Sequence, residues 1–152
     1  MESIGRYFEE FEQGQIINHQ LSKTIFESDN NFFSLLTMNH HPVHINEEYA
    51  KDGLHGKILV VGTLVFSLTV GISVPDISGK AIANLSYEVV DHLAPVFIGD
   101  TIYAKTEVIS KRQTSKSDRG IVYVETIARN QHNQEVLKFR RNVLLKKRSH
   151  AG

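Results

Sequence analysis

The stretch that decides the fold is VVGTLVFSLTVGI, which runs from residue 60 to residue 72. It is apolar on nearly every side, so none of its faces suits contact with water. Its length favours a helix that is buried all round, although its content of β-branched residues also leaves a strand open. Pro75 follows closely and is expected to end this element, because proline breaks a helix interior.

Everything downstream of this stretch has the composition of β-structure. Valine, isoleucine, tyrosine and threonine dominate four segments, which are separated by breaks rich in turn-forming residues. The expected strands are residues 80–90, 101–111, 121–128 and 136–147. One apolar helix followed by long strands without further helices predicts an α+β domain, in which an antiparallel sheet is wrapped around a central hydrophobic helix.

The segment upstream of the apolar stretch is predicted to hold short elements. Residues 14–23 alternate loosely between apolar and polar side chains, which indicates a first strand. Glu27-Ser28-Asp29 offers capping side chains and negative charge to a helix that follows. Pro42 is expected to end that helical segment, and Asn46 to cap a short helix that closes at Gly53.

Bulk composition restricts the class of protein. The 152 residues, 41% of them hydrophobic, suit a single domain over residues 1–152 with its core at about 16–147. Seventeen basic residues balance 17 acidic ones, which argues against a general binder of nucleic acid or anionic membranes. The chain has no cysteine, no signal-peptide pattern at its start and no apolar run that spans a bilayer comfortably. We expect a cytoplasmic protein that binds neither nucleic acid nor membranes.

One short polar break carries an unusual density of titrating side chains. Residues 37–50 read TMNHHPVHINEEYA and include the three histidines His40, His41 and His44. A rigid scaffold can aim such loop side chains, and imidazole exchanges protons near neutral pH. Proline separates His41 from His44, and no nearby cysteine or glutamate completes a plausible ligand shell, so no metal site is predicted.

Three motifs resemble those of a known family. They are His41-Pro42-Val43-His44, Gly62 and Pro95-Val96-Phe97-Ile98-Gly99-Asp100-Thr101-Ile102, and they are similar to motifs of the MaoC-like dehydratases, a hot-dog fold family that includes the R-specific enoyl-CoA hydratases. A second set resembles one branch, the mesaconyl-CoA hydratase or methylmalyl-CoA dehydratase type: Asp29-Asn30, Phe33-Ser34, Thr37-Met38-Asn39 and His41-Pro42. The resemblance implies a hot-dog sheet around a central helix, dimers that pair their sheets edge to edge, and sites near the dimer interface.

The resemblance also implies roles for single residues. His44 matches the family histidine and is expected to act as general base on water. The family's aspartate position holds Asn39, whose amide cannot exchange a proton at neutral pH but can hold a water molecule. Gly62 matches the glycine whose amide is the oxyanion donor, although a family histidine is replaced by Val61 beside it. The residues expected to bind substrate are His41, Val61, Thr63, Pro95 and Val96.

Each of these residues also has a purely structural interpretation. His44 could hydrogen-bond a backbone carbonyl group, Asn39 could complete a helix end, and Gly62 could serve close packing. Asp29 is a second candidate acid, although a carboxylate in the first turn of a helix is the simpler interpretation. Gly71 is expected to serve helix–sheet packing alone.

The expected function is a reversible hydro-lyase reaction on an acyl-CoA thioester. Water adds to a 2-enoyl-CoA, or leaves a 3-hydroxyacyl-CoA, whose acyl group is branched or dicarboxylic in the mesaconyl-CoA branch. Coenzyme A is part of the substrate, no separate cofactor is predicted, and the expected assembly is a homodimer or a dimer of dimers. Two alternatives stay open: an acyl-CoA thioesterase, and a non-catalytic acyl-CoA-binding protein, because the family aspartate is Asn39.

Overall fold

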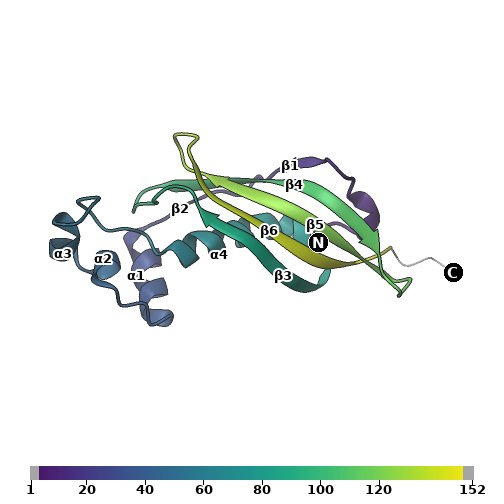
Figure 1. The fold of residues 1–152 in the computed structure, drawn as a ribbon, viewed down its shortest axis with the longest axis horizontal. Helices are drawn as coiled ribbons and strands as arrows, with labels where there is room; N and C mark the ends of the chain where they lie inside the picture. The colour runs from purple at the N-terminus through teal and green to yellow at the C-terminus, as the bar shows by residue number, and fades with distance from the viewer. Residues whose placement is uncertain (1–3, 149–152) are drawn as a thin grey trace.

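The computed structural model describes residues 4–148, which form a curved antiparallel sheet with a helix on its inner side (Figure 1). The strands are β1 (Ile16–Asn18), β2 (Lys23–Thr24), β3 (Ala81–His92), β4 (Thr101–Gln113), β5 (Arg119–Arg129) and β6 (Glu135–Lys146). Their order is β1-β4-β5-β6-β3, and β2 also pairs with β4. The helices are η1 (Phe8–Glu10), α1 (Glu27–Leu36), α2 (Pro42–Ile45), α3 (Glu47–Lys51), α4 (Gly62–Ser73) and η2 (Val74–Ser78). Within residues 4–148, no helix combines the length and apolarity needed to cross a membrane.

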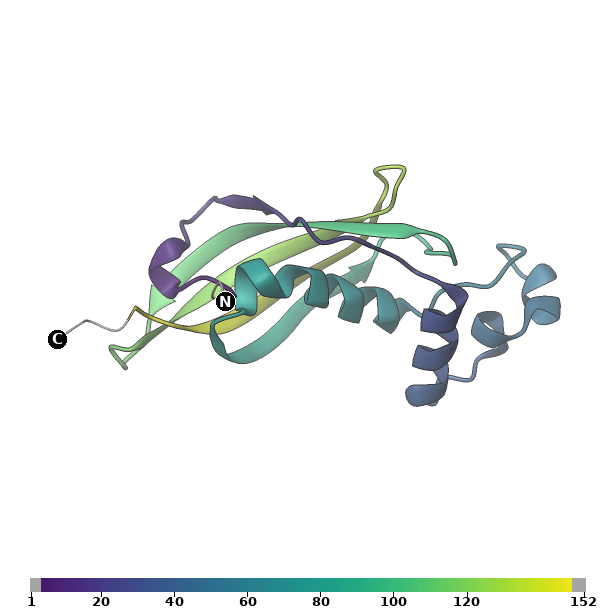
Figure 2. The same cartoon turned by 180° about the vertical axis from the view of Figure 1, so that it is seen from behind.

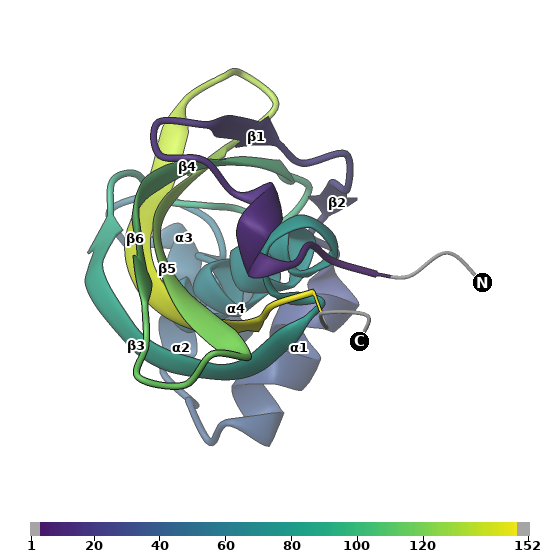
Figure 3. The same cartoon turned by 90° about the vertical axis from the view of Figure 1, so that its right-hand side faces the viewer.

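The inner side of the sheet encloses α4, as the end-on view shows (Figure 3). Side chains of β4, β5 and β6 alternate between buried and more exposed positions, so one face of each strand can pack on the helix. Val65 and Ile72 of α4 belong to the same buried cluster as Ala128 and Phe139 of the sheet. The predicted α+β architecture is confirmed, and the apolar stretch forms a helix and not a strand.

The N-terminal segment closes one end of this enclosure. Phe8 and Phe11 are buried in a second apolar cluster, which also contains Ile77 of η2. The Nζ atom of Lys111 on β4 donates hydrogen bonds to the carbonyl oxygens of Phe8 and Phe11, at 3.0 and 2.6 Å. This lysine therefore fastens the N-terminal segment to the sheet.

A first strand lies within residues 14–23 as predicted, but its predicted extent is wrong. Two short strands replace it, because they pair with different parts of β4: Ile16 lies opposite Glu107, whereas Lys23 lies opposite Ile102. Between them the backbone amide of His19 bonds the carbonyl group of Ala104.

The prediction that Pro75 ends the central helix is also wrong. The helical path continues from α4 into the π-helical turn η2, which contains Pro75. A proline is tolerated in the first turn of a helical segment, where its missing N–H removes no required hydrogen bond. Gly71 is exposed, and a Cβ atom added to it would meet no other atom within 4 Å, so its predicted packing role is wrong as well.

The helices α1, α2 and α3 lie together beyond the first residue of α4 (Figure 2). Helix α1 ends before the histidines, because Met38 adopts a left-handed conformation with φ 60° and the amide of Asn39 closes onto the carbonyl group of Ser34 at 3.0 Å. No continuous helix runs through the histidines, as predicted from Pro42. Pro42 nevertheless starts α2, at a position where proline is favoured, and does not end a helical segment. Asn46 caps α3 through its side chain, as predicted.

Candidate functional site

His44 lies on α2 with one ring nitrogen held and the other free. Its Nδ1 atom lies 2.6 Å from the carbonyl oxygen of Leu59, and since a carbonyl group can only accept, Nδ1 carries the proton. In the neutral form of the ring, Nε2 is therefore the unprotonated nitrogen, and it bonds no group in the described part of the chain. The predicted backbone hydrogen bond of His44 is thus present, and it orients the imidazole with a lone pair on Nε2.

Asn30 connects the turn of His44 to the segment that leads into α4. Its Nδ2 atom donates to the carbonyl oxygen of His44 at 3.0 Å, and its Oδ1 atom accepts from the amide of Val61 at 2.9 Å. Asn30 is only 1% exposed, so both hydrogen bonds are shielded from water. Sequence reasoning missed this role. The available signal was an asparagine in α1 four residues before Ser34, since both side chains lie on the buried side of that helix.

The first residue of α4 is Gly62, as predicted. The helix has no side-chain cap, and the amide of Val61 is already bonded to Asn30. The amides of Gly62 and Thr63 have no acceptor among residues 4–148, and they lie at the positive end of the helix dipole. Such a pair of amides can stabilise negative charge on an oxygen atom.

The other polar residues predicted for the site make mostly local contacts. Asn39 is half-buried, and its Oδ1 atom accepts a long hydrogen bond of 3.4 Å from the amide of His41. The Nδ1 atom of His41 caps α2 by accepting from the amide of Val43 at 3.2 Å, and the ring meets His44 edge-on at 6.1 Å between centroids. Asp29 bonds Lys23 and the amide of Phe26, the expected behaviour of a first-turn carboxylate.

Pro95 and Val96 stand on the segment after β3. The carbonyl group of Val96 accepts from the amide of Val60 at 2.9 Å, and the Val96 side chain is buried in the same cluster as α4. Pro95 is exposed, as is Thr63, whereas Val61 is buried. Four of the predicted substrate-binding residues therefore lie on the segments around the first turn of α4, and they differ widely in their access to solvent.

His92, the last residue of β3, is a neighbour of Gly62 that sequence reasoning missed. A Cβ atom built on Gly62 would lie 2.8 Å from Cε1 and 3.0 Å from Nε2 of His92. The imidazole therefore occupies the space that any side chain at this position would need. No local sequence pattern predicts the contact between His92 and Gly62, because it depends on how β3 lies against α4.

A cleft of about 290 Å³ opens next to this region. It is bordered by Phe97, which forms an antiparallel bridge with Leu59, and by Ile58, which precedes Leu59 in the chain. Its other lining residues are Glu27, Glu47, Lys51, Gly56, Lys57 and Ile98. The lining carries two acidic and two basic side chains, so it has no strong preference for an anion.

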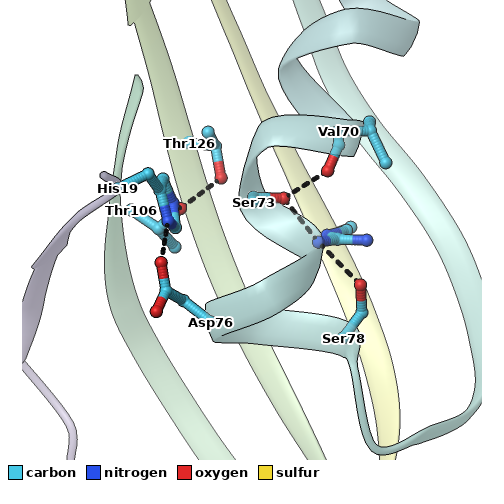
Figure 4. A network of polar contacts seen from close by, with 8 residues as sticks. His19, Val70, Ser73, Asp76, Ser78, Thr106 and Thr126 are labelled. Atoms are coloured by element: carbon cyan, nitrogen blue, oxygen red, sulfur yellow. Dashed lines mark hydrogen bonds and ion pairs between the residues drawn. The ribbon is translucent and has the colours of Figure 1, made fainter. Parts of the chain in front are cut away.

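A separate polar cluster lies at the far end of the helical path, where α4 passes into η2 (Figure 4). His19 bonds Asp76 at 2.8 Å and Thr106 at 2.7 Å, and Thr106 bonds Thr126 in turn. Burial lowers the pKa of His19, although the hydrogen bond that its ring donates to Asp76 opposes this effect. A neutral ring that donates to Asp76 and accepts from Thr106 satisfies every group, so the cluster fixes the N-terminal segment to the helix.

Arg141 of β6 is buried next to this cluster. Its Nη2 atom donates to Ser73 at 2.8 Å, and its surroundings lower the pKa of the guanidinium group through burial. The residue is only 1% exposed, and its Nε atom has no hydrogen-bond partner within residues 4–148. We interpret both polar clusters as structural, because they lie at the opposite end of α4 from Gly62.

The fold and the site together define a single hot-dog domain in which Asn30 joins the backbone of His44 to the segment that enters the free start of α4. The profile of the "MaoC like domain" family matches residues 10–130 of the chain. The chain therefore belongs to the MaoC-like dehydratase family.

Curated relatives agree with this assignment. The chain is 34% identical to the mesaconyl-CoA hydratase of Cereibacter sphaeroides over 99% of its length, but it spans only 44% of that protein. It is 36% identical to the (R)-specific enoyl-CoA hydratase of Rhodospirillum rubrum over 69% of its length, which covers 71% of that protein. The chain thus corresponds to less than half of the first of these relatives and to most of the second.

Solved structures agree as well. A MaoC domain protein from Chloroflexus aurantiacus superposes with a TM-score of 0.93 at 33% identity, over 99% of this chain and 43% of that one. A Mycobacterium tuberculosis protein described as a double hotdog fold superposes with a TM-score of 0.87, at 19% identity, over 97% of this chain and 46% of that one. The predicted hot-dog fold is thereby confirmed.

Proposed function

We propose that this chain catalyses the reversible addition of water to a 2-enoyl-CoA thioester. The observation that carries the proposal is the clamp of Asn30, which joins the backbone of His44 to that of Val61, the residue before Gly62. A general base and two free amides are thereby held in one small region. Hydration of an unsaturated thioester needs such a base and such donors, together with a proton for the α-carbon.

In the proposed reaction, Nε2 of His44 takes a proton from a water molecule. Oxygen of that water attacks C3 of the enoyl group, and electrons move toward the thioester oxygen as the C2=C3 double bond is consumed. The amides of Gly62 and Thr63 hydrogen-bond the negative oxygen of the resulting enolate. Loss of one donor of this kind costs about 3 kcal/mol of transition-state stabilisation in other enzymes. The enolate then takes up a proton at C2, which restores the thioester carbonyl and gives the 3-hydroxyacyl-CoA.

Asn39 and His41 are proposed to act on the attacking water and the acyl group. The Nδ2 atom of Asn39 bonds no group within residues 4–148, and Nε2 of His41 is equally free. An amide can donate to a water molecule and so hold it, but it cannot exchange a proton. We assign Asn39 to orientation of the water, and His41, Val61, Thr63, Pro95 and Val96 to contact with the acyl-CoA.

We further propose a branched dicarboxylic substrate of the mesaconyl-CoA type. Support comes from two relatives, the mesaconyl-CoA hydratase and the β-methylmalyl-CoA dehydratase of Chloroflexus aurantiacus, at 34% and 35% identity. Each is more than twice as long as the matched segment, since the chain covers 44% and 41% of them.

The exposed apolar edge of the sheet supports a homodimer. β3 is the last strand of the described sheet, and five of its apolar side chains are exposed: Ile82, Leu85, Tyr87, Val89 and Val90. Leu93, just after the strand, is exposed as well. Such an edge invites pairing with another strand. We propose that a second copy of this chain pairs with this edge. The longer relatives hold roughly one further chain length in the same polypeptide, since this chain covers 44% and 46% of two of them.

The test is an assay of the purified protein with mesaconyl-CoA and with crotonyl-CoA. The loss of enoyl absorbance should be catalysed by the wild type and should fall about 10²–10⁴-fold in His44→Gln, the range expected for a lost general base. His132→Gln is the matched control, since His132 is exposed in the turn between β5 and β6. A wild type that consumes neither thioester contradicts the proposal, as does a His44→Gln variant with full activity.

A second candidate function is acyl-CoA binding without turnover, and Asn39 is the observation that favours it. Its amide stands where the family resemblance places an aspartate, and its oxygen bonds a backbone amide. Calorimetric binding of crotonyl-CoA with no loss of enoyl absorbance and no release of thiol would support this candidate. Release of thiol would instead indicate a thioesterase.

A further inference from the structure

We propose that His92 is the second proton-transfer group of the site and delivers a proton to the α-carbon of the substrate. This inference rests on the proposed hydro-lyase function and assigns a residue that neither the motifs nor the family resemblance indicated. Addition of water requires a proton at C2 as well as hydroxide at C3. His44 activates the water that becomes the hydroxyl group at C3. Asn39 cannot supply the proton at C2, because an amide does not donate protons at neutral pH.

The position of His92 suits this role. The residue ends β3, where its backbone pairs with Leu137 of β6. Its ring faces the Cα atom of Gly62 with Cε1 and Nε2, which lie 2.8 and 3.0 Å from the place of a Cβ atom. A thioester oxygen bound to the Gly62 amide would therefore sit beside the imidazole, and C2 is only two bonds from that oxygen.

The other titratable groups near the loop are less suited. Nδ1 of His41 accepts the amide of Val43 and caps α2, whereas Asp29 is bonded to Lys23 and to the amide of Phe26. His40 is exposed at the surface of the loop. The ring of His92 makes no hydrogen bond within residues 4–148, so both of its nitrogens are available to a ligand.

The proposed step balances protons and electrons. His44 takes one proton from water while the C3–O bond forms and the C2=C3 π electrons pass into the enolate. The protonated ring of His92 then gives its proton to C2 as the enolate electrons form the new C2–H bond. His44 is left protonated and His92 neutral, and both return to their starting states by exchange with solvent, to which His92 is exposed.

Two measurements on the intact chain test this assignment. The first is hydration of crotonyl-CoA and mesaconyl-CoA. The second is exchange of the α-protons of butyryl-CoA and methylsuccinyl-CoA with deuterium oxide, followed by mass spectrometry. Exchange at C2 needs the amides of Gly62 and Thr63 and a group that removes the α-proton, but it needs no attack by water.

His92→Phe keeps a flat ring against Gly62, and His92→Gln keeps hydrogen bonding, but neither side chain can transfer a proton. Both variants should lose about 10²-fold or more in hydration kcat and in α-exchange, with KM changed by less than about threefold. His132→Phe is the matched control and should retain both activities. His44→Gln should lose hydration far more than exchange.

The outcomes separate the two proposals. A wild type that hydrates neither thioester overturns the hydro-lyase function and this inference together. A wild type that hydrates one of them, with His92→Phe and His92→Gln equally active, overturns the role of His92 alone. The group that protonates C2 must also be able to remove that proton. The role of His92 is therefore overturned if the folded variants hydrate slowly but exchange their α-protons at the wild-type rate. It is also overturned if the wild type hydrates a thioester but shows no exchange.

Discussion

The side chain of Asn30 accepts a hydrogen bond from the backbone amide of Val61, 31 positions later in the chain, at 2.9 Å. Through its other atom the same side chain donates to the carbonyl oxygen of His44. One buried amide therefore sets the position of a proposed base relative to the first turn of α4. Neither partner of Asn30 is a side chain, so the clamp does not depend on the identity of His44 or Val61.

Replacing Asn30 by alanine should therefore affect both stability and activity. The carbonyl group of His44 and the amide of Val61 lose their shared partner, and the free energy of unfolding should fall by about 2–4 kcal/mol. Hydration of the better enoyl-CoA should fall by about tenfold or more, since small displacements of catalytic groups are costly. Urea unfolding and kcat/KM measure the two effects.

The control for this change is Asn31→Ala. Asn31 is exposed on the same helix, so its replacement should alter the free energy of unfolding by no more than about 0.5 kcal/mol. Equal effects of the two substitutions would contradict the clamp.

Gly62→Ala and Gly71→Ala form a second matched pair on α4. The methyl group at position 62 would lie 2.8 Å from Cε1 of His92 and must displace that ring, whereas the one at position 71 meets nothing within 4 Å. Gly62→Ala should lower kcat for hydration by about tenfold or more. Gly71→Ala should leave kcat unchanged and stabilise the helix by up to about 1 kcal/mol. Steady-state kinetics and thermal unfolding distinguish them, and full activity in Gly62→Ala would show that the space beside this glycine is not used.

The pH dependence of stability should report on His19. Burial lowers its pKa in the folded state, while the unfolded chain keeps the ordinary value of about 6.5. The unfolded state therefore binds the proton more readily. The free energy of unfolding should be fully maintained above about pH 6.5 and should fall as the pH is lowered through the interval between the unfolded and folded pKa values.

His19→Gln should reduce the slope of the free energy of unfolding against pH, because glutamine does not titrate. His132→Gln, at an exposed position, should leave it unchanged. Denaturant unfolding at several pH values between about 5 and 8 measures both slopes. A slope that is identical in the wild type and His19→Gln would assign the pH dependence to other groups.

The proposed homodimer predicts that a charge on the apolar edge of β3 disrupts assembly. Leu85 is 49% exposed, and a lysine in its place would be buried without a partner in a paired sheet. The wild type should sediment as a dimer and Leu85→Lys as a monomer. Leu54 is 94% exposed and lies outside β3, so Leu54→Lys should remain dimeric. A wild-type monomer at micromolar concentration would contradict the proposal.

The order of elements could be predicted from the sequence because it depends on local patterns. A continuous apolar stretch of helical length and alternating β-branched segments identify α4 and β3 to β6 with boundaries within a few residues. Asn46 also stands where local capping logic predicts it. Local rules failed at Pro42 and Pro75, because both prolines occupy first-turn positions of new helical segments.

Long-range contacts could not be predicted in this way. The hydrogen bonds of Asn30 and the contact of His92 with Gly62 arise from the way α1 and β3 lie against α4. No sequence spacing encodes that arrangement. The roles of His44, Asn39 and Gly62, the acyl group and the cytoplasmic location stay predictions.

The place of β6 within the sheet implies that the smallest fragment able to fold extends past the family signature. That signature spans residues 10–130, yet β6 (Glu135–Lys146) forms hydrogen bonds with both β5 and β3. A version trimmed to the signature would strip β3 of its neighbour and uncover α4 along one side. It would also remove Phe8, one of the two residues that Lys111 holds at the other end. The segment that identifies the family is therefore shorter than the segment that the domain needs in order to fold.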